Sequence, residues 1–313
     1  MKKTRVWIDK APGEAILLMT AIIWGIGLVA QRQAMESMQP FAFIALRFFL
    51  GCLVLLPALV LRGMRAKADD ESTEKQKFSF RERVLPGIVC GLFMFAGTSS
   101  QQLGIMTTSA SKAGFLTSLY LVLVPVIGLL FGKKANSWVW IGVALAMVGV
   151  YFLSVDLQMT IERGDIYLLI GALFWAMQIL ALDHYSSITD TLELAFGQFL
   201  VVAVLGLVVS LSVESGGMSF DAAAWGPLLF SGIVSVAIGF TFQVVGQSKV
   251  DPALASLIMS LEAVFALFGG MLLLNERLTN REWWGCLLML AAVVLVQVKG
   301  QQIKKDLTET QVT

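Results

Sequence analysis

The chain has 313 residues, of which 57% are hydrophobic and only 14% charged, and its mean hydropathy is +0.78. A water-soluble domain of this length does not need so much apolar sequence and could not hide it from water. The formal net charge of +1 points to no particular partner, and we expect no nucleic-acid binding.

Apolar runs of membrane length follow one another along the chain. Crossing the hydrocarbon of a bilayer takes about 20 apolar residues in a helix. None of the runs alternates apolar and polar residues as the strands of a membrane barrel do. The sequence therefore predicts an all-α integral membrane protein with ten transmembrane helices, at 14–31, 40–61, 84–103, 113–131, 137–154, 165–182, 192–213, 223–245, 253–273 and 281–298.

The basic residues are distributed unequally between the two sides of this topology. With the N-terminus in the cytoplasm, 17 Lys and Arg residues lie inside and 5 outside, while Arg47 falls within a span. The positive-inside rule then places both termini in the cytoplasm of a multi-pass protein of the cell (inner) membrane. We expect three cytoplasmic segments, namely the N-terminus 1–13, a charged loop 62–83 and the tail 299–313.

The two halves of the chain resemble each other. A shift of 151 residues places Gly13 on Gly164 and Trp24 on Trp175. At a shift of 142, Cys90, Gly97, Gln101 and Gly104 fall on Gly232, Gly239, Gln243 and Gly246. We predict five-helix repeats at 14–154 and 164–298. Because five is odd, the second repeat enters the bilayer inverted, an arrangement typical of transporters with a site at the midplane.

Two tryptophans lie near the middle of their predicted helices. Trp24 shares one helix face with Gln31, and Trp175 shares the equivalent face with Gln178. Tryptophan is usually found at the membrane interface, so a mid-span indole needs a partner for its N–H or a wet cavity. We interpret both faces as lining a cavity, with simple packing between helices as the alternative.

Several other polar residues fall within apolar runs. Gln101 and Gln243 need hydrogen-bond partners, which a neighbouring helix or a substrate could supply. Glu262 lies halfway along the ninth span, where it must pair, face water or carry a proton. A proton-coupled step and a purely structural carboxyl both remain open. Tyr120 occupies the repeat position equivalent to Glu262 and is a candidate contact in the same cavity.

Further residues are interpreted more simply. Arg47 is expected to reach toward the outer interface or a backbone carbonyl, in a structural role. Lys112, at the outer start of the fourth span, could attract solutes to the mouth of the cavity or snorkel. Pro125 is expected to bend the fourth helix. His184 is the only histidine, and we find no clustered metal ligands, no nucleophile–base set and no nucleotide-phosphate motif. No cofactor, metal site or enzymatic activity is therefore expected.

The order of these motifs resembles EamA-type members of the drug/metabolite transporter superfamily over residues 14–298. The resemblance is carried by Ala15-Ile16-Leu17, Trp24-Gly25, Ala45-Leu46-Arg47-Phe48, the segment Thr108–Phe115, Leu261-Glu262 and Asn275-Glu276-Arg277-Leu278-Thr279. The chain departs from the family pattern at Ala263, where proline is frequent, and at Asn275, where glycine is frequent. The resemblance implies a central cavity lined mainly by the first, third, fourth, sixth, eighth and ninth helices, and alternating access. Relatives move amino acids, other small metabolites or drugs, often outward.

The function expected from these features is secondary transport of a small organic metabolite such as an amino acid, by an exporter or exchanger. The substrate would bind at Trp24, Gln101, Lys112, Tyr120, Trp175, Gln178, Gln243 and Glu262. The expected partners are this small molecule, the lipid bilayer and, through Glu262, protons. A passive channel for small solutes and a drug efflux carrier are the alternatives. The sequence leaves the oligomeric state open.

Overall fold

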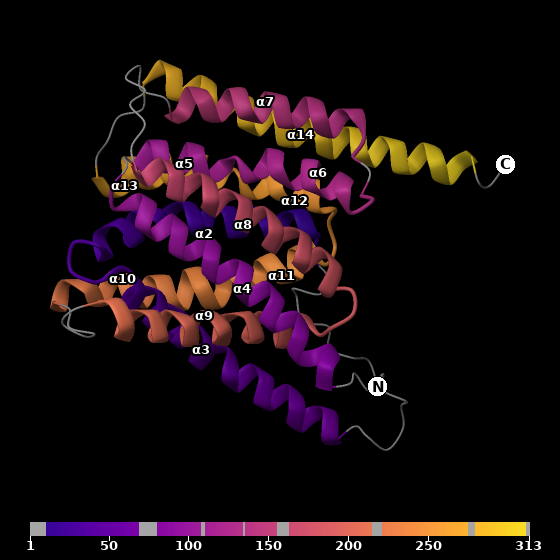
Figure 1. Cartoon of the computed structure of the whole chain (residues 1–313). Coiled ribbons are helices and arrows are strands. Elements are labelled where there is room, and N and C mark those ends of the chain that lie inside the picture. The colour runs from indigo at the N-terminus through magenta and orange to yellow at the C-terminus, as the bar shows by residue number, and fades with distance from the viewer. Residues whose placement is uncertain are drawn as a thin grey trace.

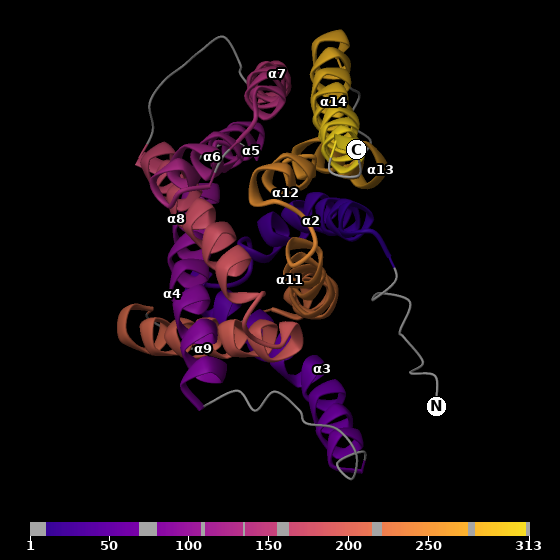
Figure 2. The ribbon, with the colours of Figure 1, turned by 90° about the vertical axis from the view of Figure 1, so that its right-hand side faces the viewer.

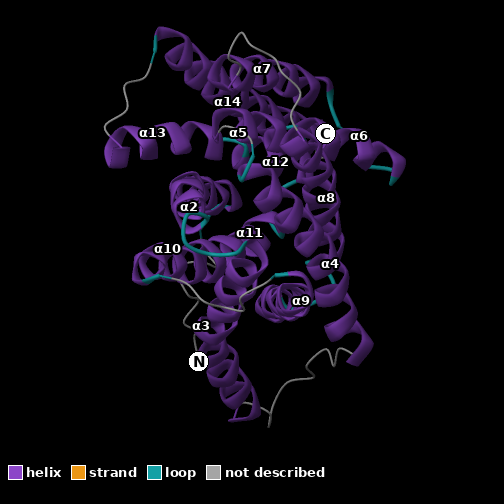
Figure 3. Cartoon of the chain, turned by 60° about the vertical axis from the view of Figure 1, so that its left-hand side comes forward, coloured by secondary structure: helices purple, strands orange, loops and turns teal. Residues whose placement is uncertain are grey.

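The computed structural model describes residues 11–68, 80–107, 110–133, 135–154, 163–214, 221–274 and 279–310. Every regular element in these ranges is a helix, and Figure 3 shows helices joined by loops without a strand. The predicted all-α class is confirmed.

The first half of the chain supplies five spans, the fourth of which is interrupted. In chain order its helices are α2 (Gly13–Ala34), α3 (Pro40–Ala68), α4 (Phe80–Ile105), α5 (Ala110–Ser118), α6 (Tyr120–Leu130) and α7 (Ser137–Ser154). Helices α5 and α6 together make the fourth span.

The second half repeats this order with a more divided eighth span. Its elements are α8 (Arg163–Tyr185), α9 (Thr191–Val213), η1 (Ala222–Ala224), α10 (Trp225–Leu229), η2 (Phe230–Phe240), α11 (Thr241–Gln247), α12 (Pro252–Met259), α13 (Glu262–Leu274) and α14 (Asn280–Thr310). Segments η1 to α11 form the eighth span, with η2 in the π conformation, and α12 with α13 forms most of the ninth.

Length and composition make nine of the described helical segments able to cross a membrane, and the shorter apolar helix Ser137–Leu153 brings the number to ten. Helix α9 shows why these helices belong in lipid. Its buried face carries Phe199 and Val202, while its outer face carries Val208 and Leu211, which are 54% and 69% exposed. A helix that is apolar all round needs protein on one side and lipid on the other. The prediction of ten helical spans is confirmed.

The two ends of the bundle differ in which connections they hold. Helix α2 begins and α14 ends at the same end of the bundle, on the right in Figure 1. We call this end the terminus side. The loop between α11 and α12 lies there too, and Lys249 in that loop donates a hydrogen bond to the carbonyl of Ala11 at 3.0 Å.

The halves pack against each other through equivalent contacts. A Cβ atom added to Gly104 on α4 would lie 2.5 Å from Cγ of Leu168 on α8. A Cβ atom added to Gly246 on α11 would lie 2.7 Å from Cγ of Leu17 on α2. Gly104 and Gly246 are equivalent at the shift of 142, and Leu17 and Leu168 are equivalent at the shift of 151. Only glycine allows either crossing, because each leucine occupies the space that a side chain would need.

One predicted pairing of the repeats is wrong by one residue. A Cβ atom on Gly91 would lie 3.1 Å from the carbonyl oxygen of Gln198, and one on Gly232 would lie 3.1 Å from that of Arg47. Gln198 and Arg47 are equivalent at the shift of 151, so Gly91 and not Cys90 corresponds to Gly232. The π-helix η2 explains the change, because a π-turn accommodates an extra residue and raises the shift from 141 to 142 beyond it.

Helices α7 and α14 pack as a pair at one edge of the molecule (Figure 2). Their closest approach lies at two glycines, since a Cβ atom on Gly149 would lie 2.9 Å from the carbonyl oxygen of Gly285. The same view, taken from the terminus side, shows α2, α8, α11 and α12 toward the middle of the bundle. These central helices surround the candidate site.

Candidate functional site

Two spans are interrupted at equivalent depths. Helix α5 ends at Ser118 and α6 begins at Tyr120, while α12 ends at Met259 and α13 begins at Glu262. Leu119 and Leu261, which stand 142 residues apart, bridge the interruptions. Their amides donate to the carbonyl three residues back instead of four, at 3.3 and 3.2 Å. Each of the two spans therefore contains one tightened turn near its middle.

The interruption of the fourth span does not lie at Pro125, where the sequence predicts a bend. Pro125 lies inside α6, and the fourth span is interrupted at Leu119, six residues earlier. The ninth span is interrupted at the equivalent place, although the residue two positions after Leu261 is Ala263 and not proline. Proline removes one backbone N–H, but it does not set the position of either interruption.

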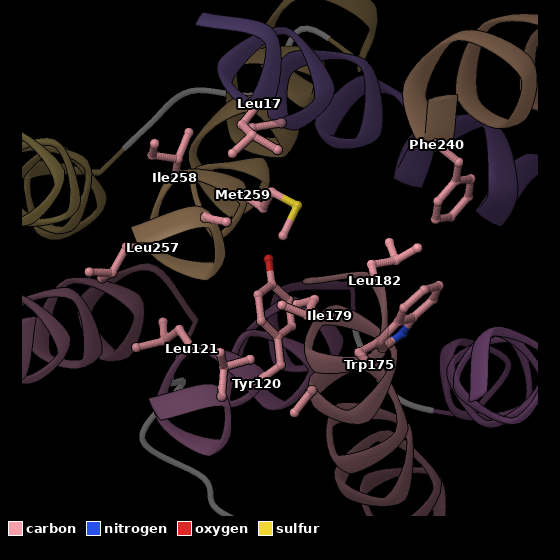
Figure 4. Close-up of a cluster of buried hydrophobic side chains, with 14 of the residues drawn as sticks. Leu17, Tyr120, Leu121, Trp175, Ile179, Leu182, Phe240, Leu257, Ile258 and Met259 are labelled. Atoms are coloured by element: carbon pink, nitrogen blue, oxygen red, sulfur yellow. The ribbon is translucent and has the colours of Figure 1, made fainter. Parts of the chain in front are cut away.

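The first residues after the two interruptions meet each other. The phenol of Tyr120 donates a hydrogen bond to Oε1 of Glu262 over 3.4 Å. Both side chains are buried, at 4% and 9% exposure. Figure 4 shows the hydroxyl of Tyr120 directed away from its own helix toward the side chain of Met259. Tyr120 and Glu262 are also repeat equivalents, so this bond lies where the two halves are related to each other.

A cavity surrounds this pair. Its walls come from α2, α3, α4, α5, α6, α8, η2, α11, α12 and α13, and its lining residues are Trp24, Leu28, Gln31, Arg47, Gln101, Thr117, Tyr120, Trp175, Ile179, Ser235, Phe240, Gln243, Met259 and Glu262. Its volume of about 40 Å³ holds only about three water molecules. A larger molecule would enter only after the helices move apart.

The two mid-span tryptophans face this cavity and rest on equivalent glycines. A Cβ atom on Gly97 would lie 3.2 Å from the ring of Trp175, and one on Gly239 would lie 2.9 Å from Nε1 of Trp24. Phe240 lies between the indoles, with ring centroids 4.6 Å from Trp24 and 5.9 Å from Trp175. Nε1 of Trp24 donates to the carbonyl of Ser235 at 3.4 Å, while Nε1 of Trp175 has no partner among the described residues.

The predicted glutamines divide into two groups. Gln101 and Gln243 line the cavity. Gln178 is fully buried behind Gln243, and the two amides exchange hydrogen bonds of 3.1 and 3.4 Å. Gln178 also donates to Oε1 of Gln198 at 3.2 Å. The amides of Gln178 and Gln198 therefore form a second layer that holds Gln243 in place at the cavity wall.

Arg47 occupies a different place from the one predicted. Its side chain is 4% exposed and lines the cavity, so it does not reach the outer interface. Its guanidinium carbon lies 5.0 Å from the ring centroid of Phe43 and 5.2 Å from that of Phe48. Snorkelling requires an exposed head group, and burial between two rings rules it out here.

The cavity is closed toward the terminus side. Leu17, Leu182 and Ile258 are at most 2% exposed and belong to the apolar cluster drawn in Figure 4. Gln247 lies beyond them and donates to the carbonyl of Ile179, a lining residue, at 3.5 Å. On the opposite side the lining extends to Gln31, only one turn from the end of α2. The cavity therefore lies closer to the surface opposite the terminus side.

A polar vestibule of about 400 Å³ occupies the terminus side of this barrier, lined by Lys133, Asp183, His184, Ser186, Ser187, Gln247, Ser248, Lys249, Val250 and Asp251. Lys133 and Asp183 form a salt bridge across it. Asp251 caps α12 by accepting from the amide of Ala253 at 3.0 Å. Loss of solvation raises the pKa of Asp251, and the neighbouring carboxylate of Asp183 raises it further.

Lys112 completes the set of predicted residues. It belongs to α5, but its side chain lies outside the described part of the structure, as do the charged residues 69–79 of the predicted loop. Sequence reasoning missed Thr117, Ser235, Phe240 and the lining position of Arg47. Phe240 could have been found from its place one turn before Gln243, whereas Ser235 is brought to the wall by the π-turns of η2.

This geometry of ten spans and two interrupted helices agrees with comparisons to known proteins. A family model described as the EamA-like transporter family matches residues 11–155 and again residues 162–298. The chain belongs to the EamA-like transporter family. The resemblance inferred from the sequence is confirmed, and the protein is a multi-pass membrane transporter with a small-molecule substrate.

Relatives of this EamA-like transporter are themselves named as transporters. An uncharacterized transporter of Archaeoglobus fulgidus is 33% identical over 288 residues, which cover 90% of this chain and 85% of that protein. The uncharacterized inner membrane transporter YedA of Escherichia coli K12 is 26% identical over 88% of this chain and 87% of its own length. A protein crystal structure superposes with a TM-score of 0.75 at 17% identity, covering 93% of this chain and 98% of that one, and shows the same fold.

Proposed function

We propose that this EamA-like protein is a secondary transporter that moves a small organic metabolite, such as an amino acid, by alternating access around the central cavity. The observation that carries the proposal is the meeting of two interrupted helices, one from each half, at the Tyr120–Glu262 hydrogen bond inside the cavity. Interrupted helices at the interface of inverted repeats are where secondary transporters bind substrates and coupling ions.

Alternating access is supported by the unequal closure of the two sides. The apolar barrier with Leu17, Leu182 and Ile258 separates the cavity from the vestibule, whereas the opposite wall is thin near Gln31. The structure therefore resembles the state closed on the terminus side. Opening of that side requires the salt bridge between Lys133 and Asp183 to break.

The salt bridge between Lys133 and Asp183 is weak enough to break and re-form during a transport cycle. Lys133 and Asp183 have side chains that are 48% and 15% exposed. Ion pairs that reach solvent contribute only about 0–1 kcal/mol, so thermal motion and substrate binding are enough to open this one. Equivalent glycine crossings join the two halves at α4–α8 and at α2–α11, and closely packed helices of this kind can slide past each other in shear motions.

The membrane and orientation follow from the charge distribution. We place the protein in the cell (inner) membrane with both termini in the cytoplasm, so that the terminus side and its vestibule face the cytoplasm. The sequence holds no nucleotide-phosphate motif, so substrate exchange or protonation of Glu262 would supply the driving force. The expected direction is export or exchange.

A ligand screen tests the proposal and identifies candidate substrates at the same time. Purified protein is screened by thermal shift against a metabolite library, and each hit is tested for flux into proteoliposomes. Trp24→Ala and Trp175→Ala should weaken binding of the hits by roughly 10-fold, since buried aromatic contacts dominate such sites. Trp284→Ala is the matched control, because Trp284 is 62% exposed on the outside of α14. Hits that bind the three variants equally would contradict a substrate site in the cavity.

A further inference from the structure

Arg47 is a buried cation whose Nε atom has no hydrogen-bonding partner among the described residues. Its side chain is 4% exposed, and its Nε atom meets neither a protein acceptor nor solvent among the described residues. Among the described residues, Arg62 forms an ion pair with Asp190 and Lys133 forms one with Asp183, but no carboxylate pairs with Arg47. The guanidinium instead lies near the rings of Phe43 and Phe48.

The two aromatic rings do not replace an anion. A cation–π contact contributes about 0.5–2 kcal/mol, whereas removing an unpaired charge from water costs several kcal/mol even after relaxation. Arginine does not escape this cost by losing its proton, because its pKa in water lies above 12. Arg47 is thus a costly residue at this position unless an anion reaches it for part of the transport cycle.

The cavity also contains a carboxyl group that is not paired with Arg47. Glu262 lines the same cavity from α13, and its only described hydrogen bond is the long one from Tyr120. Arg47 belongs to the first half of the chain and Glu262 to the second. One small cavity therefore contains a basic and an acidic side chain that belong to different halves and make no ion pair with each other.

We propose that Arg47 and Glu262 are the two poles of one binding site, with Arg47 receiving an oxyanion of the transported molecule and Glu262 receiving its positively charged group. The inference rests on the proposed transport function and specifies its substrate class as small zwitterions. A zwitterion satisfies both poles at once, while a plain cation or a plain anion leaves one buried charge unpaired. Guanidinium groups suit this role because their forked N–H donors match the geometry of an oxyanion.

The aromatic residues of the cavity add further contacts for a bound molecule. Trp24, Trp175 and Phe240 form one wall. Indole faces attract cations, and they also pack against an apolar body. The unpartnered indole N–H of Trp175 offers a further donor for the bound molecule. A site with two charged poles and an aromatic wall selects by charge separation rather than by size alone.

The test uses matched probes that differ in one charge. Each proteinogenic L-amino acid is tested with its methyl ester, which lacks the carboxylate, and its N-acetyl derivative, which lacks the ammonium group. Binding is measured by thermal shift on the full-length protein, and flux is measured in proteoliposomes. Each zwitterion that binds should bind at least about 10-fold more tightly than its methyl ester and its N-acetyl derivative. This is the difference in affinity expected for the loss of one hydrogen-bonded charge. An ester or acetyl derivative that binds as tightly as its parent would overturn the assignment of the corresponding pole.

Variants test whether Arg47 is the pole that receives the oxyanion of the substrate. Arg47→Gln should lower affinity for the zwitterion about 10-fold or more and leave the affinity for the methyl ester unchanged, and Arg47→Lys should restore part of the loss. A merely structural arginine would weaken both probes alike. Arg62→Gln is the control, since Arg62 is an exposed arginine outside the cavity. If Arg47→Gln does not fold, the ratio of zwitterion to ester binding in wild-type protein and in Arg47→Lys decides the question.

Failure of the inference can be distinguished from failure of transport. Flux of a sugar, a plain cation or a plain anion from the wider metabolite library, with no response to any zwitterion, would overturn the two-pole site while the transport function stands. The absence of flux for every compound in both sets would contradict the proposed function and the inference together. Zwitterion flux that is unaffected by Arg47→Gln would overturn the role of Arg47 alone.

Discussion

Tyr120 and Glu262 are equivalent residues of the two halves, and they are joined by a hydrogen bond of 3.4 Å inside the cavity. Each is the first residue of a helix that resumes after an interruption. Equivalent residues can touch only where a symmetry axis passes between them. The bond therefore marks the centre of the inverted repeat, and it places an ionisable group from one half beside a phenol from the other.

The first prediction concerns protons. Glu262 is the only carboxylate that lines the described cavity, so a proton carried with the substrate would be carried there. Wild-type flux in proteoliposomes should then depend on an imposed pH gradient, and Glu262→Gln should abolish this dependence. Tyr120→Phe is the comparison variant, because it removes the phenol and keeps the carboxyl. Unchanged pH dependence in Glu262→Gln would show that Glu262 does not carry the proton, whereas wild-type flux that is indifferent to the gradient would leave exchange as the driving process.

The second prediction concerns the glycines beneath the tryptophans. In Gly97→Ala the new methyl group would lie 3.2 Å from the ring of Trp175, and in Gly239→Ala it would lie 2.9 Å from Nε1 of Trp24. Overpacking of this kind costs about 1–3 kcal/mol, and it should push each indole into the cavity. We expect weaker ligand binding in both variants by thermal shift. Gly63→Ala, which has no atom within 4 Å of the added carbon, should bind normally.

Much of the fold could be predicted from the sequence because membrane spans follow from simple composition. Runs of apolar residues predict ten helices close to the observed bounds, and the repeated Gly and Trp positions predict two equivalent five-helix repeats. The depth of the helix interruptions could not be predicted, since Pro125 is a visible signal in the wrong place and Leu261 carries no signal at all. The sequence also gives no signal for the one-residue insertion in η2, because π and α turns use the same apolar residues.

The role of Arg47 shows a second limit of the sequence. A basic residue seven positions from the start of a predicted span is within snorkelling distance of the interface, so a structural role is the simpler interpretation. Burial between Phe43 and Phe48 depends on tertiary packing, which no local pattern reports. Gln178 illustrates the reverse case, since it shares the face of Trp175 but is separated from the cavity by Gln243.

The third prediction concerns the salt bridge across the vestibule. Lys133→Gln and Asp183→Asn should each favour opening on the terminus side by about 2- to 5-fold, the population change that corresponds to a partly exposed ion pair. The measurement is the rate at which a membrane-impermeant maleimide labels Ile179→Cys from that side, in a background lacking the three native cysteines.

A double variant and a control variant show whether the labelling rate reports on this salt bridge. Because the two residues act together, the double variant should label no faster than either single variant. Arg62→Gln, which breaks an ion pair that lines neither the vestibule nor the cavity, should leave the rate unchanged. Additive effects of Lys133→Gln and Asp183→Asn would show that the two residues do not act as one closure.

The fourth prediction concerns the pH dependence of stability through Asp251. Loss of solvation raises the pKa of its carboxyl in the folded protein, so folding favours the protonated form. Its stabilising effect is complete below the ordinary pKa of about 4 and is lost as the pH rises through the higher folded value. The melting temperature of Asp251→Asn, which keeps the N-cap, should fall less than that of wild type across this range. Parallel curves would contradict the assignment, and Asp251→Ala should lose about 1 kcal/mol at any pH from the missing cap.

The most direct test of the central claim is counterflow in proteoliposomes with a ligand found in the screen. A cavity that opens to one side at a time predicts that labelled ligand enters vesicles preloaded with excess unlabelled ligand faster than empty ones, overshoots its equilibrium level, and saturates with concentration. Uptake that rises linearly with concentration and is indifferent to preloading would show a passive channel, and it would contradict the alternating-access mechanism proposed for this cavity.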